Sequence, residues 1–155
     1  MSTTVLLKDI VDALEMQFDT SSSFVDLDTG QVETVSNDLL GEAEEADDDD
    51  ELDLPEWQKP EWELAKRIVS SDRFLKLPDK FDVHEWSIMQ DFANSVSSAR
   101  VSQDLLNAIH GSGAFRYFKD TLRRHRIEEA WFAFRTEALE EIARDWCEEH
   151  HVAWR

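Results

Sequence analysis

The chain has 155 residues, the size of one ordinary domain, and its 35 acidic against 16 Lys and Arg residues give a formal net charge of −19. Long-range repulsion therefore argues against a membrane surface or strong nucleic-acid binding by the chain as a whole. A lone cysteine, Cys147, excludes an intramolecular disulfide, and no apolar stretch suits a signal peptide or a membrane span, so we expect a cytoplasmic protein.

The first third of the chain carries most of the negative charge. Residues 1–56 hold 18 acids and one base, whereas residues 57–155 hold 17 acids and 15 bases. The run 41–51 has eight acids and no large apolar side chain, so its burial cannot offset the entropy cost of ordering it. We predict three parts, which are a helix plus hairpin over 1–37, a flexible acidic linker over 38–56 and a helical domain over 57–155.

Two kinds of local pattern precede the acidic run. Apolar residues at helical spacing, including Phe18, predict an amphipathic helix from about Leu7 to Gln17. Residues that favour strands then lie on both sides of Asp28-Thr29-Gly30, where glycine can take the positive φ of a tight turn. This pattern predicts a two-stranded hairpin, which must pack on something to be stable.

The rest of the sequence carries signals that are typical of the starts and ends of helices. Pro60 precedes an apolar stripe that ends near Ser71, and Asp82 with Glu85 resembles a capping box at the start of another helix. Periodic apolar residues predict further helices over about 102–109 and 114–126, and a last helix that reaches about Glu149. The expected fold class is α+β and mostly helical, with a bundle of about five helices after the linker.

A cationic segment stands out in this acidic chain. Between residues 100 and 126 there are six bases against two acids. Two glycines precede a helix whose free amides attract anions, and its cations fall within an arc of about 80° on a helical wheel. We predict an anion-binding site formed by Gly111, Gly113, Arg116, Lys119, Arg123 and Arg126. The alternative is a solvated face whose cations pair with nearby acids, with the glycines forming a corner between helices.

Other residues suggest weaker hypotheses. Trp57 and Trp62 are interpreted as exposed anchors for a partner, although burial in the core is the usual fate of tryptophan. Cys147, His150 and His151 have a spacing that could bind a metal, but three residues near the C-terminus do not make a closed zinc site. We therefore predict no metal and no cofactor, and we find no signature of a catalytic centre.

Several stretches together resemble the bacterial uncharacterised protein family 0158. They are FVDLDTGQV at 24–32, the acidic run, PEW at 55–57, LPDKFD at 77–82, GSGAFR at 111–116, FKD at 118–120 and WCEE at 146–149. The resemblance covers nearly the whole chain and implies a small bacterial α+β protein. This family has no assigned activity, substrate or cofactor, so the resemblance implies no catalytic residue.

Three hypotheses about function follow from these patterns. The first is a non-catalytic interaction or regulatory protein that binds a protein partner, or a phosphate-bearing ligand, at the helix after Gly113. In this hypothesis the acidic linker screens the cationic helix. The second is an acidic inhibitor that imitates a nucleic acid and occupies a basic partner. The third is an enzyme acting on a nucleotide or phosphoester, with phosphate held between Gly111 and Lys119.

Overall fold

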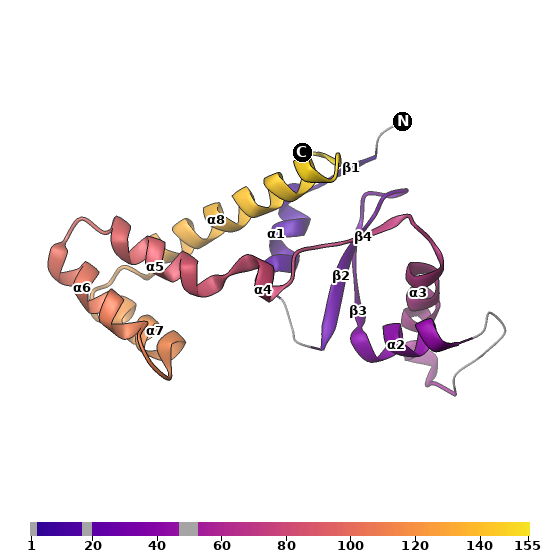
Figure 1. The fold of residues 1–155 in the computed structure, drawn as a ribbon, viewed down its shortest axis with the longest axis horizontal. Coiled ribbons are helices and arrows are strands. Elements are labelled where there is room, and N and C mark those ends of the chain that lie inside the picture. Colours follow the sequence, from indigo (N-terminus) through magenta and orange to yellow (C-terminus); the bar gives the residue numbers. More distant parts are fainter. Residues whose placement is uncertain (1–2, 17–19, 47–52) are drawn as a thin grey trace. The chain divides into compact units, whose positions relative to one another are not determined.

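A computed structural model of the chain describes residues 3–16, 20–46 and 53–155, which divide into two compact units (Figure 1). Unit 1 combines Met1–Asp79 with Ala143–Arg155, and unit 2 is Lys80–Ile142. The expected helical domain over 57–155 is therefore shared between the two units. The structure confirms the α+β, mostly helical class, with a helix and hairpin followed by a helical bundle.

Unit 1 is built around two small sheets. Its elements are β1 (Thr4–Val5), α1 (Leu7–Glu15), β2 (Ser21–Asp26), β3 (Val32–Ser36), α2 (Asn37–Glu45), the 3₁₀ turn η1 (Glu56–Gln58), α3 (Lys59–Ser70), β4 (Phe74–Lys76), the last turns of α8 (Glu128–Glu149) and β5 (Ala153–Trp154). One sheet has the antiparallel order β3-β2-β4, and in the other β1 pairs in parallel with β5.

The predicted hairpin is confirmed and gains a third strand. The β2–β3 register runs from Ser21 opposite Ser36 to Val25 opposite Val32. The turn between them is fixed by Asp26, whose Oδ1 accepts from the backbone amide of Asp28 at 2.9 Å, and by Gly30 with φ of 76°. β4 covers the other edge of β2, so the hairpin does not stand alone.

The prediction of a flexible linker over 38–56 was wrong for its first residues, because α2 occupies Asn37–Glu45. The Ser36 hydroxyl caps this helix by accepting from the Asp38 amide at 3.2 Å. Leu39 and Ala43, four residues apart, are buried in a core cluster that α3 completes. Acidic side chains occupy the outer positions, so one buried stripe suffices to fold the segment. Residues 47–52 of the predicted linker lie outside the described residues.

The first helix matches its prediction at the start. α1 begins at Leu7, as expected, and ends at Glu15, while Gln17 and Phe18 lie outside the described residues. Its buried side chains are those expected from the periodicity: Ile10, Val11 and Leu14. Among the described residues, no helix combines the length and the apolar character that crossing a bilayer requires.

Unit 2 is entirely helical in its described elements. They are α4 (Lys80–Val83), α5 (Glu85–Ser95), α6 (Ala99–Ala108), α7 (Ala114–Arg124) and the first part of α8. An aromatic cluster joins α5, α7 and α8, since the Phe92 ring lies 6.4 Å from the Phe118 ring and 5.4 Å from the Trp131 ring, edge to face. Figure 1 shows α5 alongside α8, with α6 and α7 following at one end of α5.

The boundaries of the unit 2 helices correct two predictions. Asp82 does not cap α5, because it lies inside α4. The helical conformation is interrupted at His84, which has φ of 54° and precedes α5 as its N-cap. α6 starts at Ala99 rather than near Ser102, because the Ser98 hydroxyl caps it by accepting from the Val101 amide at 3.4 Å.

Candidate functional site

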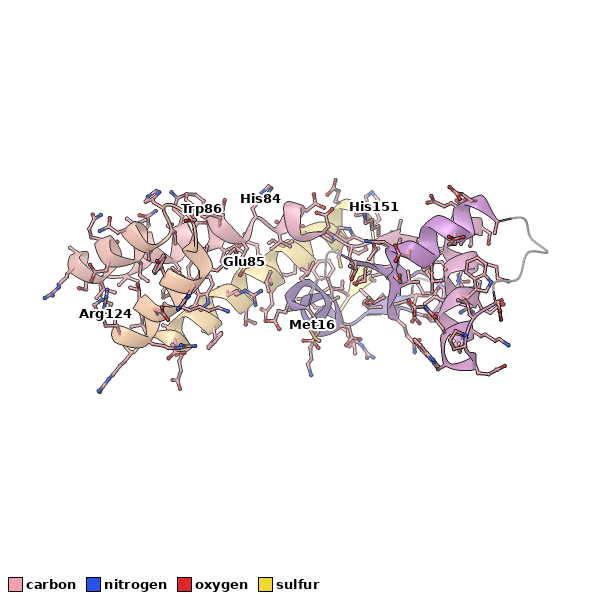
Figure 2. The ribbon with its side chains drawn as sticks, turned by 90° about the horizontal axis from the view of Figure 1, so that it is seen from below. Met16, His84, Glu85, Trp86, Arg124 and His151 are labelled. Carbon is pink, nitrogen blue, oxygen red and sulfur yellow. The ribbon has the colours of Figure 1, made fainter. Side chains whose placement is uncertain are left out.

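The two glycines before α7 shape a corner between helices. Gly111 and Gly113 have φ of 102° and 76°, values that other residues rarely adopt, and Gly113 is the N-cap of α7 without a side-chain cap. The preceding turn is anchored by Trp86, labelled in Figure 2, whose indole donates to the Ile109 carbonyl at 2.9 Å. The positive φ of both glycines is therefore explained by the turn itself, and their part in an anion-binding site stays a prediction.

The cations of the predicted anion-binding site have different environments. Arg116 and Lys119 are exposed on α7 and make no ion pair with any residue that the structure describes. Arg123 lies 3.8 Å from Asp120 and is therefore partly neutralised. Arg126 lies beyond the end of α7 at Arg124, and its φ is 55°, so it does not continue the helical row of cations.

The next cation along α7, Arg124, forms an ion pair within unit 2. Arg124, labelled in Figure 2, lies 3.5 Å from Asp104 on α6, and His125 lies 3.0 Å from the same carboxylate. These contacts tie the end of α7 to α6. Within α7, the cations that have no ion-pair partner among the described residues are therefore Arg116 and Lys119.

An aromatic pocket lies beside these cations and was not predicted. Its volume is about 300 Å³, and its lining residues come from α5, α7 and α8: Glu85, Met89, Phe115, Phe118, Lys119, Trp131, Phe132 and Arg135. Buried Met89, Phe118 and Trp131 form the apolar floor. Phe115 and Phe132 keep 54% and 58% of their surface exposed. The structure thus places Lys119 next to a pocket lined mostly by apolar side chains.

One wall of the pocket is fixed by an ion pair. Arg135 Nε donates to Glu85 Oε1 at 2.6 Å, and Arg135 Nη2 to Glu85 Oε2 at 3.5 Å, with both side chains half-buried. This pair links α5 to α8 and occupies both charges. Among the three charged residues of the lining, Lys119 is the one without an ion-pair partner among the described residues.

The two candidate anchor tryptophans have different environments. Trp57 in η1 is 77% exposed, so its availability to a partner stays a prediction. Trp62 is only 3% exposed and belongs to the core cluster of unit 1, so its proposed role as an exposed anchor was wrong. The reason is helical spacing, because Trp62, Ala65 and Ile68 form the inward face of α3.

Of the C-terminal residues considered as metal ligands, Cys147 is buried, whereas His150 and His151 are exposed. Burial, with a smaller contribution from Glu148, raises the pKa of the Cys147 thiol to about 11, so the thiolate that a metal requires is disfavoured. The His150 ring packs against the Trp146 ring, with 4.9 Å between centroids. Within the described part of the chain, no group of three His, Cys, Asp or Glu residues could hold a metal ion.

Comparison with known proteins places the chain in a family. The model of an uncharacterised protein family, UPF0158, matches residues 3–154. The chain belongs to UPF0158. A Pseudomonas aeruginosa protein that carries this family's name is 27% identical over 97 residues, which are 61% of this chain and 63% of that protein. No solved structure matches the chain.

Proposed function

We propose that this protein is a non-catalytic interaction or regulatory module of the cytoplasm that binds a partner protein through the aromatic pocket of unit 2. The recognised segment carries an apolar side chain next to negative charge. The observation that carries the proposal is the exposure of Phe115 and Phe132 on a pocket whose lining includes Lys119, a cation without an ion-pair partner among the described residues.

The aromatic rings supply the apolar part of the recognition. Phe115 and Phe132 each leave more than half of their surface in water, and covering them with a partner would remove this apolar area from solvent. Buried aromatic anchors in pockets account for most of the binding energy in many interfaces. The pocket volume of about 300 Å³ suits one large side chain better than an extended ligand.

Charge selects the kind of segment that can enter. Arg116 and Lys119 favour a carboxylate or phosphate beside the apolar side chain, since charge-assisted hydrogen bonds are stronger than neutral ones. The net charge of −19 repels long polyanions such as RNA, so a short acidic segment of a protein fits better.

A peptide titration tests the proposal. Fluorescence anisotropy is measured with a labelled peptide Glu-Asp-Trp-Asp-Glu, and with control peptides in which the acids become lysine or the tryptophan becomes alanine. We expect binding of the first peptide alone, weakening as salt rises, because salt screens the contribution of Lys119. Lys119→Glu should abolish binding, whereas Lys8→Glu, which reverses an exposed lysine of α1, should leave it unchanged.

Aromatic variants complete the test. Phe132→Ala should weaken binding of the acidic peptide about tenfold or more. Tyr117→Ala is the matched control, because Tyr117 is 57% exposed on α7 but does not line the pocket. Equal effects of both substitutions, or no binding of any peptide, would rule out the pocket as the recognition site.

The cations of α7 could also bind a phosphate-bearing ligand in place of an acidic peptide. At 100 times its dissociation constant, such a ligand stabilises the folded state by about 2.7 kcal/mol. Melting curves with inorganic phosphate and nucleotides therefore decide between a phosphate and an acidic peptide. A shift that Arg116→Ala and Lys119→Ala both remove would favour phosphate and reopen the hypothesis of a phosphoester enzyme, whereas flat curves would favour the peptide.

An acidic inhibitor that imitates a nucleic acid is the second candidate, favoured by the charge of unit 1. Residues 1–79 and 143–155 contain 25 acids and eight bases, and α2 exposes Asp38, Glu42 and Glu44. Salt-sensitive capture of a basic protein, lost when the four aspartates 47–50 become asparagine, would support this function.

A further inference from the structure

We propose that the segment bound by the pocket is the Trp57 turn of a second copy of this chain, an inference that rests on the function proposed above. Trp57 is 77% exposed, the largest exposed fraction among the large hydrophobic side chains that the structure describes. It lies in unit 1, whereas the pocket lies in unit 2. Each copy therefore carries both halves of the contact.

The turn presents Trp57 in a defined conformation. Pro55 precedes η1 with φ of −57°, and the Gln58 amide donates to the Pro55 carbonyl at 3.0 Å. Glu56 and Lys59 form an ion pair at 2.8 Å across the same turn. Because this backbone is already folded, binding of the indole costs less conformational entropy than binding of a disordered peptide would.

The pocket matches an indole in size and in chemistry. Its volume of about 300 Å³ is roughly twice that of an engineered apolar cavity that admits benzene. Phe118 and Trp131 already contact each other edge to face, at 4.9 Å between centroids, and an added aromatic ring extends such packing. Lys119 in the lining can also approach the face of the indole, a favourable cation–π contact.

Charge complementarity singles out this occupant. Asp53, an exposed carboxylate four residues before Trp57, fits Lys119 in the pocket lining. Glu56 is exposed as well, and it shares its charge with Lys59 at 2.8 Å. Unit 1 has 25 acids against eight bases, so the surroundings of the Trp57 turn are acidic and are attracted to the exposed cations Arg116 and Lys119 of α7.

Because each copy carries one Trp57 turn and one pocket, reciprocal exchange between two copies is the pairing that fills every pocket. Such an exchange uses the same contact twice about a twofold axis and closes the assembly as a dimer. The two contacts then strengthen each other, because the second forms within an assembly that the first has already brought together.

Sedimentation velocity of the full chain over a concentration series tests the inference. We expect a monomer–dimer equilibrium that Trp57→Ala weakens about 30-fold or more. Lys119→Glu and Glu56→Lys should each weaken the dimer. An equimolar mixture of these two variants should restore it, because the mixed dimer has one wild-type contact and one contact with the two charges exchanged. Tyr117→Ala, an exposed aromatic outside the pocket, should dimerise like the wild type.

The outcomes separate this inference from the proposed function. A wild-type chain that stays monomeric from micromolar to millimolar concentration, or a dimer that Trp57→Ala leaves intact, would overturn the inference. If the monomeric chain still binds the acidic tryptophan peptide, the proposed function stands without the second copy. If it binds no peptide, both fail. Circular dichroism of each variant checks that the fold is unchanged.

Discussion

The turn of the β2–β3 hairpin should not tolerate any side chain larger than that of glycine. Gly30 has φ of +76°, and a Cβ added there would lie 2.4 Å from the backbone oxygen of Thr4 in β1. The left-handed conformation costs a residue with a Cβ about 1–2 kcal/mol, and overpacking against a rigid neighbour costs about 1–3 kcal/mol. We therefore expect Gly30→Ala to lower the free energy of unfolding by about 2–5 kcal/mol.

Two other glycines separate the backbone effect from the steric one. Gly111→Ala meets no atom within 4 Å but has φ of +102°, so we expect it to lose only the conformational part, about 1–2 kcal/mol. Gly41→Ala lies inside α2 with open space around it and should stabilise the chain by about 0.5–1 kcal/mol.

Urea denaturation followed by circular dichroism and by tryptophan fluorescence measures these differences, and agreement between the two signals tests for a single transition. The expected order of stability is Gly41→Ala, wild type, Gly111→Ala and Gly30→Ala. A Gly30→Ala protein within about 0.5 kcal/mol of the wild type would refute the close packing of the turn on β1. A Gly111→Ala protein as unstable as Gly30→Ala would refute the steric part of the argument.

Three further predictions concern the stability and reactivity of unit 1. Burial alone would raise the pKa of Asp26, but its hydrogen bond with Arg73, at 2.7 Å, lowers that pKa below 3.8, so Asp26→Asn should cost about 1–2 kcal/mol at pH 7. Urea titrations should show this difference shrinking as the pH falls below 3.8 and the wild-type carboxylate gains its proton; a difference independent of pH would contradict the ion pair. Ser36→Ala should lower stability by about 1 kcal/mol, because the Asp38 amide loses its cap; an unchanged urea midpoint would argue against a folded α2. Cys147, whose pKa is raised to about 11, should resist iodoacetamide in the native protein at pH 8 and react once urea unfolds it, as mass spectrometry would show; rapid native labelling would contradict its burial.

The helices were predictable because their signals are local. Ile10, Val11 and Leu14 give the inward stripe of α1, and the last helix ends at Glu149, as expected. The predictions of helix boundaries were wrong where the conformation of a single residue sets the boundary. The αL conformation of His84 separates α4 from α5, and nothing in the spacing of Asp82 and Glu85 indicates it.

Contacts between distant parts of the sequence were not predictable in the same way. β4 pairs with β2 across about fifty residues, and the short run Phe74–Lys76 has no alternating pattern of its own. The pocket has the same origin, because Phe115 and Phe132 belong to different helices. The sequence singled out Lys119 through its charge, but only packing of α5, α7 and α8 shows that it borders an aromatic pocket.

The parallel pairing of β1 with β5 has a consequence for biosynthesis. The Leu7 amide donates to the Arg155 carbonyl, and the Arg155 amide donates to the Val5 carbonyl, each at 3.0 Å. These bonds require residues 153–155, which follow Lys80–Ile142 in the chain and are therefore translated after all of unit 2. The Val5 strand thus gains its neighbour only after every residue of unit 2 has been synthesised. Unit 1 therefore completes its β1–β5 sheet late in biosynthesis, because the two strands come from opposite ends of the sequence.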